Sequence, residues 1–181
     1  METQRLRIRR LTVRDAEDIY AYSRDPLVAK HVLWDAQRHI GEAKSYIRAQ
    51  IRKYRSGEPA SWGIELKETG RVIGTIGYMW WQRENGTVEV GYSLAREQWN
   101  KGIMTEALRE VLRYTFSTLR MHRVEAQHET DNAASGRVME KCGMRHEGTL
   151  RGRLFNKGRY VDVELYGMLA EDYNKVKPSA F

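Results

Sequence analysis

The sequence predicts one α/β domain with a mixed sheet, mostly antiparallel, that has a parallel pair of strands at its centre. Three observations lead to this class. The 181 residues, 41% of them apolar, suit a single domain over 1–181, with a core at about 5–169 and a C-terminal tail at 170–181. Hydrophobic periodicity gives the element order βααβββαβαββ. The strand, long helix and strand within that order can place two strands side by side in parallel.

The first elements are a strand and helices. Apolar residues alternate with arginines over residues 5–11, which predicts a short strand. Thr12, followed three residues later by Asp15, is typical of a helix N-cap, and Pro26 ends that helix and allows another short one. A further helix is predicted over residues 42–55, because its apolar residues recur every three or four positions.

The hydrophobic period changes to that of strands from Trp62 onward. Residues 62–67, 72–81 and 87–94 are predicted to form three successive antiparallel strands. The Asn85-Gly86 step between the last two is typical of a tight hairpin turn.

The remaining elements alternate between helix and strand. A long helix begins around Gly102, and its apolar face extends to Leu119. Gly143 suits the left-handed position that follows a helix C-terminus. We therefore expect a strand at 123–128, a helix at 132–142 and two final strands at 145–155 and 160–169.

The net charge of +7 is unevenly distributed. Residues 1–57 carry 13 Lys and Arg against 7 Asp and Glu, whereas residues 58–181 carry 18 against 17. A basic region of this kind suits nucleic acid, an anionic membrane, an acidic protein or a phosphate-bearing cofactor, and charge alone does not choose among them.

Two further features bear on the cellular setting. No apolar run approaches the ~18 residues that a membrane-spanning helix needs, so we expect no membrane span. The single cysteine, Cys142, cannot form an internal disulfide, and the charged N-terminus does not resemble a secretory signal. We therefore expect a reduced, cytoplasmic setting.

The most informative segment joins the strand at 87–94 to the long helix. Free backbone N–H groups at a helix start, with the helix dipole behind them, bind anions such as phosphate. Gly102 lets the backbone approach a ligand closely, and Lys101 adds a positive charge. Many such junctions bind nothing, and neither the nucleotide-triphosphate loop nor the dinucleotide motif is present.

A second pair of polar residues opens the helix at 132–142. Asn132 is a good helix cap, and Ser135 lies one turn later on the same side. Capping with an exposed serine is the simpler interpretation of this pair, and ligand binding is the alternative.

Together the two segments resemble the GNAT superfamily of N-acetyltransferases, in the branch that includes the ribosomal-protein N-terminal acetyltransferases. The resemblance covers about residues 5–169 and rests on several motifs in the family's order. These motifs are Val90-Gly91-Tyr92, Trp99-Asn100-Lys101-Gly102, Thr105-Glu106-Ala107, Asn132 with Ser135, and Glu140-Lys141-Cys142-Gly143.

The resemblance implies the GNAT fold, with helices on both faces of the sheet and a central strand pair splayed to hold acetyl-CoA. The loop and helix start at 99–104 would hold the pyrophosphate through backbone N–H groups. The pantetheine arm would lie along the strand at 87–94, where a bulge would leave N–H groups free to polarise the thioester carbonyl. The implied cofactor-binding residues are Tyr92, Ser93, Leu94, Trp99, Asn100, Lys101, Gly102, Ile103, Met104, Thr105, Asn132 and Ser135.

The chain departs from the family's loop pattern at two positions. Asn100 replaces a usual glycine, and Met104 replaces the last small residue of the pattern. A methionine at the helix start would either crowd the phosphates or turn its side chain into the core. Cofactor affinity is the property that this departure affects.

Acetyl transfer to an alkyl amine needs a base, because such an amine is mostly protonated near neutral pH, and the leaving thiolate benefits from a hydrogen-bond donor. Many relatives use a tyrosine as that donor at the position of Met139, which cannot donate, so Ser135 is the better candidate. We favour Glu89 as the base, since it should point away from the apolar residues of its strand. Asp162 and Glu164 are its rivals.

The leading hypothesis is an acetyl-CoA-dependent N-acetyltransferase whose acceptor is a primary amine, first of all the α-amino group of a ribosomal protein. A polyamine, an amino acid or an antibiotic stays open as acceptor. An aromatic cluster is expected either in the core or along an acceptor cleft, and it consists of Tyr78, Trp80, Trp81 and Trp99, with Trp34 and Trp62 elsewhere in the chain.

From a different class, the basic helix at 42–55 would make the chain a non-catalytic nucleic-acid- or ribosome-binding protein. No motif for sequence-specific nucleic-acid recognition is present. The five histidines lack zinc-binding spacing, so no metal is expected. Relatives are often dimers, and the resemblance therefore suggests a homodimer.

Overall fold

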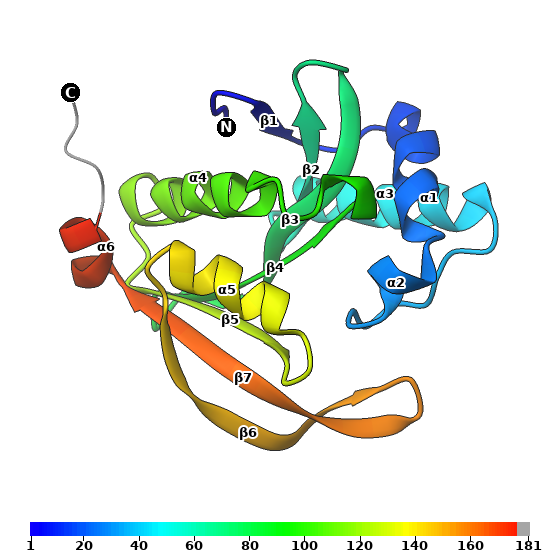
Figure 1. The fold of residues 1–181 in the computed structure, drawn as a ribbon. Helices are drawn as coiled ribbons and strands as arrows, with labels where there is room; N and C mark the ends of the chain where they lie inside the picture. Colours follow the sequence, from blue (N-terminus) through cyan, green and yellow to red (C-terminus); the bar gives the residue numbers. More distant parts are fainter. Residues whose placement is uncertain (177–181) are drawn as a thin grey trace.

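The computed structural model describes residues 1–176, which form one seven-stranded sheet in the order β1-β2-β3-β4-β5-β7-β6, with helices around it (Figure 1). The strands are β1 (Leu6–Arg9), β2 (Ser61–Leu66), β3 (Arg71–Gln82), β4 (Thr87–Leu94), β5 (Arg123–Glu129), β6 (Arg145–Asn156) and β7 (Arg159–Leu169). The helices are α1 (Ala16–Ser23), α2 (Pro26–Ala29), α3 (Ile40–Ser56), α4 (Ile103–Ser117), α5 (Ala133–Lys141) and α6 (Ala170–Val176), with short 3₁₀ turns at Val13–Asp15 and Arg96–Gln98.

The predicted mixed sheet is confirmed, and its single parallel contact is short. All the other neighbouring strands pair antiparallel, whereas β4 and β5 are parallel and pair only through Thr87, Val88 and Glu89 of β4. Beyond Glu89 the two strands diverge, so residues 90–94 pair with β3 on one side only. This divergence is the splayed central pair that the family resemblance implied.

The two faces of the sheet carry separate apolar clusters, as expected for helices on both sides. One cluster joins α4 and α5 to the sheet, and includes Leu108, Leu112 and Met139. The other joins α1 and α3 to the opposite face, and includes Ile19 and Ile47. In Figure 1, α4 and α5 lie in front of the sheet and α3 lies behind it. A strand residue therefore faces either the α4–α5 side or the α1–α3 side, according to its parity.

The observed elements follow the predicted order, with shifts at their ends. Helix α3 begins two residues before the predicted start at residue 42, and α4 ends at Ser117, so Leu119 lies beyond it. No element was assigned to the expected tail, yet residues 170–176 form α6; residues 177–181 lie outside the described residues. No helix among residues 1–176 combines the length and apolar character that crossing a bilayer requires.

Candidate active site

The site is centred on the gap where β4 leaves β5. On β4, Val88, Val90 and Tyr92 pack into the α4–α5 cluster. The side chain of Glu89 points to the other face, where it meets Trp80 of β3, and this confirms the predicted alternation. The expected irregularity lies on the neighbouring strand instead of on β4 itself, because the register shift of the β3–β4 ladder falls between Tyr78 and Trp80. β4 therefore keeps a regular, open edge toward the gap.

The loop between β4 and α4 has the backbone of an anion site. Gly102 adopts φ +72° as the residue that precedes α4, a left-handed conformation that glycine tolerates best. Asn100, which replaces the family's glycine, also takes a left-handed φ of +59°, as asparagine can. The N–H groups at the start of this 15-residue helix need acceptors from outside the helix, and an anion supplies them.

Met104 turns into the core, so it does not crowd that loop. Its side chain is 6% exposed and packs within the α4–α5 cluster together with Ile103. Of the two alternatives that the sequence left open, the structure therefore supports the one in which the Met104 side chain packs into the core. Both residues face the loop only through their backbone.

The polar and aromatic side chains of the loop lie around this backbone. Trp99 donates its ring N–H to the carbonyl of Leu94 at 2.9 Å, which fixes the end of β4 against the loop. The ammonium of Lys101 is exposed and 3.4 Å from Gln98 Oε1, so it is available to an incoming anion. Thr105 directs its carbonyl toward the thiol of Cys142, which ties α4 to α5.

Sequence reasoning missed Arg5, which lies at the same loop. Its guanidinium donates to the carbonyl of Lys101 at 3.0 Å and pairs with Glu106 at 2.7 Å. A second cation therefore stands beside the start of α4. No local pattern could have identified it, because Arg5 comes from the segment before β1 and lies about a hundred residues away in the sequence.

The start of α5 meets β4 across the gap. The hydroxyl of Tyr92 donates to the carbonyl of Ser135 at 3.1 Å. Asn132 occupies the N-cap position, but its side chain does not cap the helix backbone as expected. Its amide instead donates to Ser135 Oγ at 3.1 Å, which leaves the hydroxyl hydrogen of Ser135 free to donate elsewhere. The two polar segments of the sequence are thus brought together.

Glu89 is a buried carboxylate with one occupied oxygen. Its Oε2 accepts hydrogen bonds from Trp80 Nε1 at 2.9 Å and from Gln127 Nε2 at 3.1 Å, and the side chain belongs to the buried class. Burial raises the pKa of this carboxyl, although the two hydrogen bonds oppose the shift. Among residues 1–176, Oε1 has no hydrogen-bond partner, so it is available to a water or an amine.

The rival carboxylates are engaged in the β6–β7 hairpin. Glu164 accepts from His146 at 2.5 Å and Thr149 at 2.9 Å, and the His146 contact lowers the pKa of this carboxyl. Asp162 accepts from the backbone N–H of Gly152 at 2.7 Å. Neither carboxyl lies on β4 or β5, the strands that border the gap.

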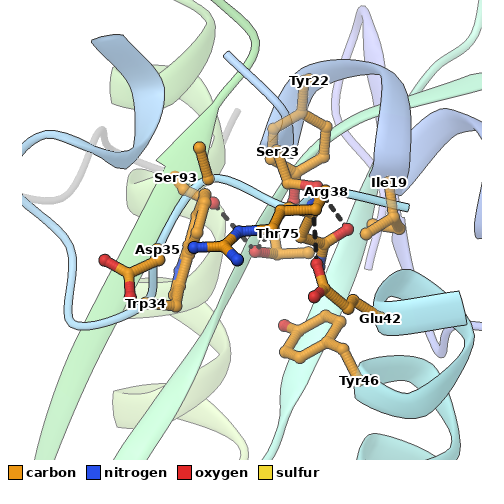
Figure 2. Close-up of a pocket in the computed structure, with 12 residues that line it drawn as sticks. Ile19, Tyr22, Ser23, Trp34, Asp35, Arg38, Glu42, Tyr46, Thr75 and Ser93 are labelled. Atoms are coloured by element: carbon orange, nitrogen blue, oxygen red, sulfur yellow. Dashed lines mark hydrogen bonds between the residues drawn. The ribbon is translucent and has the colours of Figure 1, made fainter. Parts of the chain in front are cut away.

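A cavity of about 410 Å³ opens on the same face as Glu89 (Figure 2). Buried hydroxyls form part of its lining, because Thr75 Oγ1 lies 3.2 Å from Ser93 Oγ and 3.5 Å from the hydroxyl of Tyr22. Ser93 belongs to the segment of β4 that has left β5, so the cavity reaches the gap. The lining residues are Ile19, Tyr22, Ser23, Trp34, Asp35, Ala36, Gln37, Arg38, Glu42, Tyr46, Thr75 and Ser93.

The outer wall of this cavity is the loop between α2 and α3, which includes Trp34. The tip of the β6–β7 hairpin holds that loop from outside, because the ammonium of Lys157 donates to the carbonyls of Val32 at 2.7 Å and Trp34 at 3.2 Å. Lys157 itself has a left-handed φ of +49°, which is uncommon for a residue other than glycine. Residues more than 120 positions apart thus meet at the cavity.

Buried Glu129, at the end of β5, also contacts both the tip of the β6–β7 hairpin and the loop between α2 and α3. It accepts from Asn156 at 2.5 Å and lies 3.2 Å from His31 Nδ1. His31, Glu129 and Asp131 offer ligand atoms that all lie within 4.8 Å of one another, but Arg159 also approaches Glu129 to 3.6 Å. A guanidinium beside the carboxylate supplies the charge that a metal ion would bring, so these residues suit a structural contact better than an ion.

The remaining sequence candidates belong to the core. Met139, at the position of the family's tyrosine, is 1% exposed and packs from α5 into the core. Cys142 is a free, buried thiol, as predicted, and burial raises its pKa to about 12. It is therefore protonated near neutral pH and is not a nucleophile.

Comparisons with known proteins agree on the family. Residues 5–145 match the model of the acetyltransferase (GNAT) domain. The chain is 33% identical to the uncharacterized N-acetyltransferase p20 of Bacillus licheniformis over 171 residues, which cover 94% of this chain and 96% of that protein.

A second relative and a solved structure extend this agreement. A Bacillus subtilis relative, which carries the name "Putative ribosomal N-acetyltransferase YdaF", is 32% identical over 64% of each chain. A GNAT-family acetyltransferase from Bacillus anthracis has the same fold, with a TM-score of 0.85 and 26% identity over 94% of this chain and 98% of that one. The open β4 edge and the anion site before α4 fit the thioester arm and the pyrophosphate of acetyl-CoA. The chain therefore belongs to the GNAT family of acetyltransferases, and it is an acyltransferase that uses acetyl-CoA to acetylate an amine.

Proposed function

We propose that this enzyme acetylates the α-amino group at a protein N-terminus by direct attack on bound acetyl-CoA. The observation that carries the proposal is the position of the cavity. It opens on the α1–α3 face at Ser93, in the part of β4 that no longer pairs with β5. The loop that follows β4 ends at Gly102, where the backbone N–H groups at the start of α4 form the proposed anion site. An amine entering the cavity therefore approaches the edge along which the thioester arm would bind.

Glu89 acts as the base of the reaction. It lies on the same face as Ser93, four residues earlier on β4, which is about 13 Å along the strand. It does not line the cavity, and we propose that its free oxygen removes the amine proton through a chain of waters. A raised pKa suits this role, because a carboxylate closer in pKa to the operating pH is a stronger base.

The other groups stabilise charge as the amine attacks. Acetyl-CoA would supply the acetyl group: a bond forms between the amine nitrogen and the carbonyl carbon, the bond from that carbon to sulfur breaks, and CoA is released as the thiol. The backbone N–H groups on the open edge of residues 90–94 would polarise the carbonyl, and the hydroxyl hydrogen of Ser135 is free to donate to the departing thiolate. Tyr92, Ser93, Leu94 and Asn132 border the arm, while residues 99–105, with Trp99, Asn100, Lys101, Gly102 and Thr105, hold the phosphates.

The proposed acceptor is a ribosomal protein. The sequence motifs of the branch and the similarity to YdaF support this choice, and so does the basic charge of residues 1–57, which favours approach to an anionic ribosome. We propose that the enzyme forms one domain and acts in the cytoplasm, where its buried thiol stays reduced, and that it associates as a homodimer. A small amine is the second candidate acceptor, because a cavity of about 410 Å³ lies within the ~300–1,000 Å³ range of small-molecule sites.

A panel of acceptors tests the proposal. Thiol release from acetyl-CoA is measured with N-terminal peptides of ribosomal proteins, the same peptides with a blocked α-amine, spermidine, free amino acids and an aminoglycoside. We expect transfer to the free peptides only. Equal transfer to the blocked peptides would shift the acceptor to lysine side chains, and faster transfer to a small amine would favour the second candidate.

A further inference from the structure

The cavity has one cation whose charge no other residue neutralises. Arg38 lines it from the α2–α3 loop, and among residues 1–176 its guanidinium has no ion-pair or hydrogen-bond partner. Figure 2 shows the Arg38 side chain extending into the cavity from that loop. The usual interpretation of such a group is an arginine that water solvates. Three features of its surroundings point instead to a binding group.

The backbone around Arg38 is fixed on both sides. Its N–H donates to Glu42 Oε2 at 2.7 Å, and its carbonyl accepts from the hydroxyl of Tyr20 at 3.1 Å. The preceding residue, Gln37, is held by Ser23 through its backbone N–H at 3.1 Å and its side-chain amide oxygen at 2.7 Å. The loop is thus ordered at the point from which the guanidinium extends, so its backbone needs no further ordering when that group binds a ligand.

The carboxylates of the cavity are directed elsewhere. One carboxylate oxygen of Glu42 accepts a hydrogen bond from the backbone N–H of Arg38, and the other lies 3.6 Å from His39 Nε2. Asp35 is 91% exposed and lies 4.0 Å from the ammonium of Lys157. Arg9 and Arg123, by contrast, pair with two carboxylates each. A guanidinium left unpaired beside two carboxylates is therefore open to an anion from the ligand.

The N-terminus of α3 adds a positive partial charge beside Arg38, although Asp35 and Glu42 line the same cavity. Arg38 lies two residues before α3, a 17-residue helix whose positive dipole end faces the same rim. A planar guanidinium binds a carboxylate through two parallel hydrogen bonds, which lysine cannot reproduce. The hydroxyls of Tyr22, Thr75 and Ser93 lie deeper, toward β4, where the amine must arrive.

We propose that the acceptor carries a carboxylate near its reactive amine, and that Arg38 binds this carboxylate while the amine reaches β4. The inference rests on the proposed function and sharpens it: the preferred N-termini have an acidic residue at the second or third position. Arg38 is then the residue that determines acceptor specificity, and it takes no part in the chemistry.

Matched peptides test this assignment. Two peptides that differ only by Glu or Gln at position 2, and two that differ in the same way at position 3, are compared as acceptors at low and high salt. We expect kcat/KM to be about five- to tenfold higher for one Glu peptide than for its Gln partner, mainly through KM, and the preference to shrink as salt rises. Free amino acids and their amides form a second arm, which tells whether a backbone carboxylate serves equally.

Two variants locate the effect. Arg38→Ala should reduce the Glu/Gln ratio of kcat/KM to about one, and Arg38→Lys should restore only part of the ratio. Arg48→Ala removes the same charge from the outside of α3, away from the cavity, and should leave the ratio as in wild type. A Glu preference that survives Arg38→Ala, or that Arg48→Ala abolishes equally, would overturn the inference.

Equilibrium binding separates this inference from the proposed function. The same peptides are titrated into the protein saturated with CoA, which requires no transfer. Tighter binding of a Glu peptide that depends on Arg38 supports the inference even if no acceptor is acetylated, in which case only the proposed function fails. Transfer to N-termini with no preference for Glu in rate or binding would leave the proposed function intact and remove the role of Arg38.

Discussion

The cofactor side and the acceptor side of the site differ in how the chain builds them. The cofactor side comes almost entirely from one continuous stretch, the end of β4, its loop and the start of α4, and its contacts are mainly backbone groups. The acceptor cavity combines α1, the α2–α3 loop, α3, β3 and β4, and its contacts are side chains. A backbone site constrains few residue types, whereas a side-chain site can change its ligand with each substitution.

This difference shows how one fold can keep its co-substrate and change its acceptor. Variation in the α2–α3 loop alters the cavity without moving the strand that carries Glu89 or the glycine that precedes α4. Variants placed on either side should therefore affect different kinetic constants.

The largest effect is expected at Glu89, the proposed base. Glu89→Gln keeps the shape and the contact with Trp80 but removes the base, so kcat/KM should fall about 10²–10³-fold. In the wild type the activity should decline as the pH falls through the raised pKa of this carboxyl, because its protonated form cannot accept the amine proton. The variant should lose that acidic limb.

Glu164→Gln is the matched control for this prediction, since it removes the rival carboxylate from β7. We expect nearly wild-type kcat/KM and an unchanged pH profile. If instead Glu164→Gln abolishes turnover and Glu89→Gln does not, the base lies on the hairpin and the proposed mechanism is wrong.

Gly102→Ala tests the cofactor side alone. A side chain at φ +72° strains the backbone by about 1–2 kcal/mol and shifts the N–H groups at the start of α4. The KM for acetyl-CoA should rise about tenfold, the loss expected for one hydrogen bond to a charged group, while the acceptor KM stays the same. Initial rates with each substrate varied in turn give both constants.

Gly57→Ala provides the control for that strain. Gly57 ends α3 with φ +70° and open space around it, far along the chain from the loop. The Gly57→Ala variant should lower the free energy of unfolding by about as much as Gly102→Ala does, without changing the KM for acetyl-CoA. An equal change of KM in both variants would mean that Gly102 matters for stability only.

Lys157→Met should affect the acceptor side alone. The variant keeps the length of the side chain but loses its bonds to Val32 and Trp34, which releases the cavity wall. We expect the acceptor KM to rise about fivefold, the equivalent of one neutral hydrogen bond, with the KM for acetyl-CoA unchanged. Lys157→Arg should recover part of the loss, and a rise in both KM values would show that the hairpin supports the whole site.

The smallest effect is expected for Cys142→Ala. The thiol is buried and protonated, so kcat/KM should stay within about twofold of wild type. Thermal unfolding should show a loss of about 1 kcal/mol from the lost packing. A large drop in turnover would mean that a side chain on the cofactor side matters as much as its backbone.

The same contrast explains what the sequence could predict. The strand order, the parallel pair, the facing of Glu89 and the glycine before α4 follow from local periodicity and from motifs that lie close together in the chain. The cavity could not be predicted, because the contact of Lys157 with Val32 joins segments more than 120 residues apart and leaves no periodic signal. Arg5 escaped prediction for the same reason.

Local expectations failed where a tertiary contact competed with them. Asn132 was expected to cap α5 through its side chain, but its amide meets Ser135 instead. The sequence could not decide where the Met104 side chain lies, since a residue at a helix start can face either the core or the ligand, and its burial places it in the core. Trp34 lines the cavity, although it lies outside the aromatic cluster that was expected either in the core or along an acceptor cleft.

The three residue pairs that join β4 to β5 also have a consequence for how the chain folds during synthesis. Strands β1 to β3 each pair with the next strand in sequence, so the ladder from β1 to β4 needs nothing from residues beyond 94, and the turns between β2 and β3 and between β3 and β4 are short. Such local pairing forms early, and the N-terminal part of a chain leaves the ribosome first. We expect backbone amides of β2 and β3 to gain protection before those of β5 and β7 in pulse-labelled hydrogen exchange during refolding. The short β4–β5 pairing beside the proposed substrate site would then form after the pairing of β1 to β4.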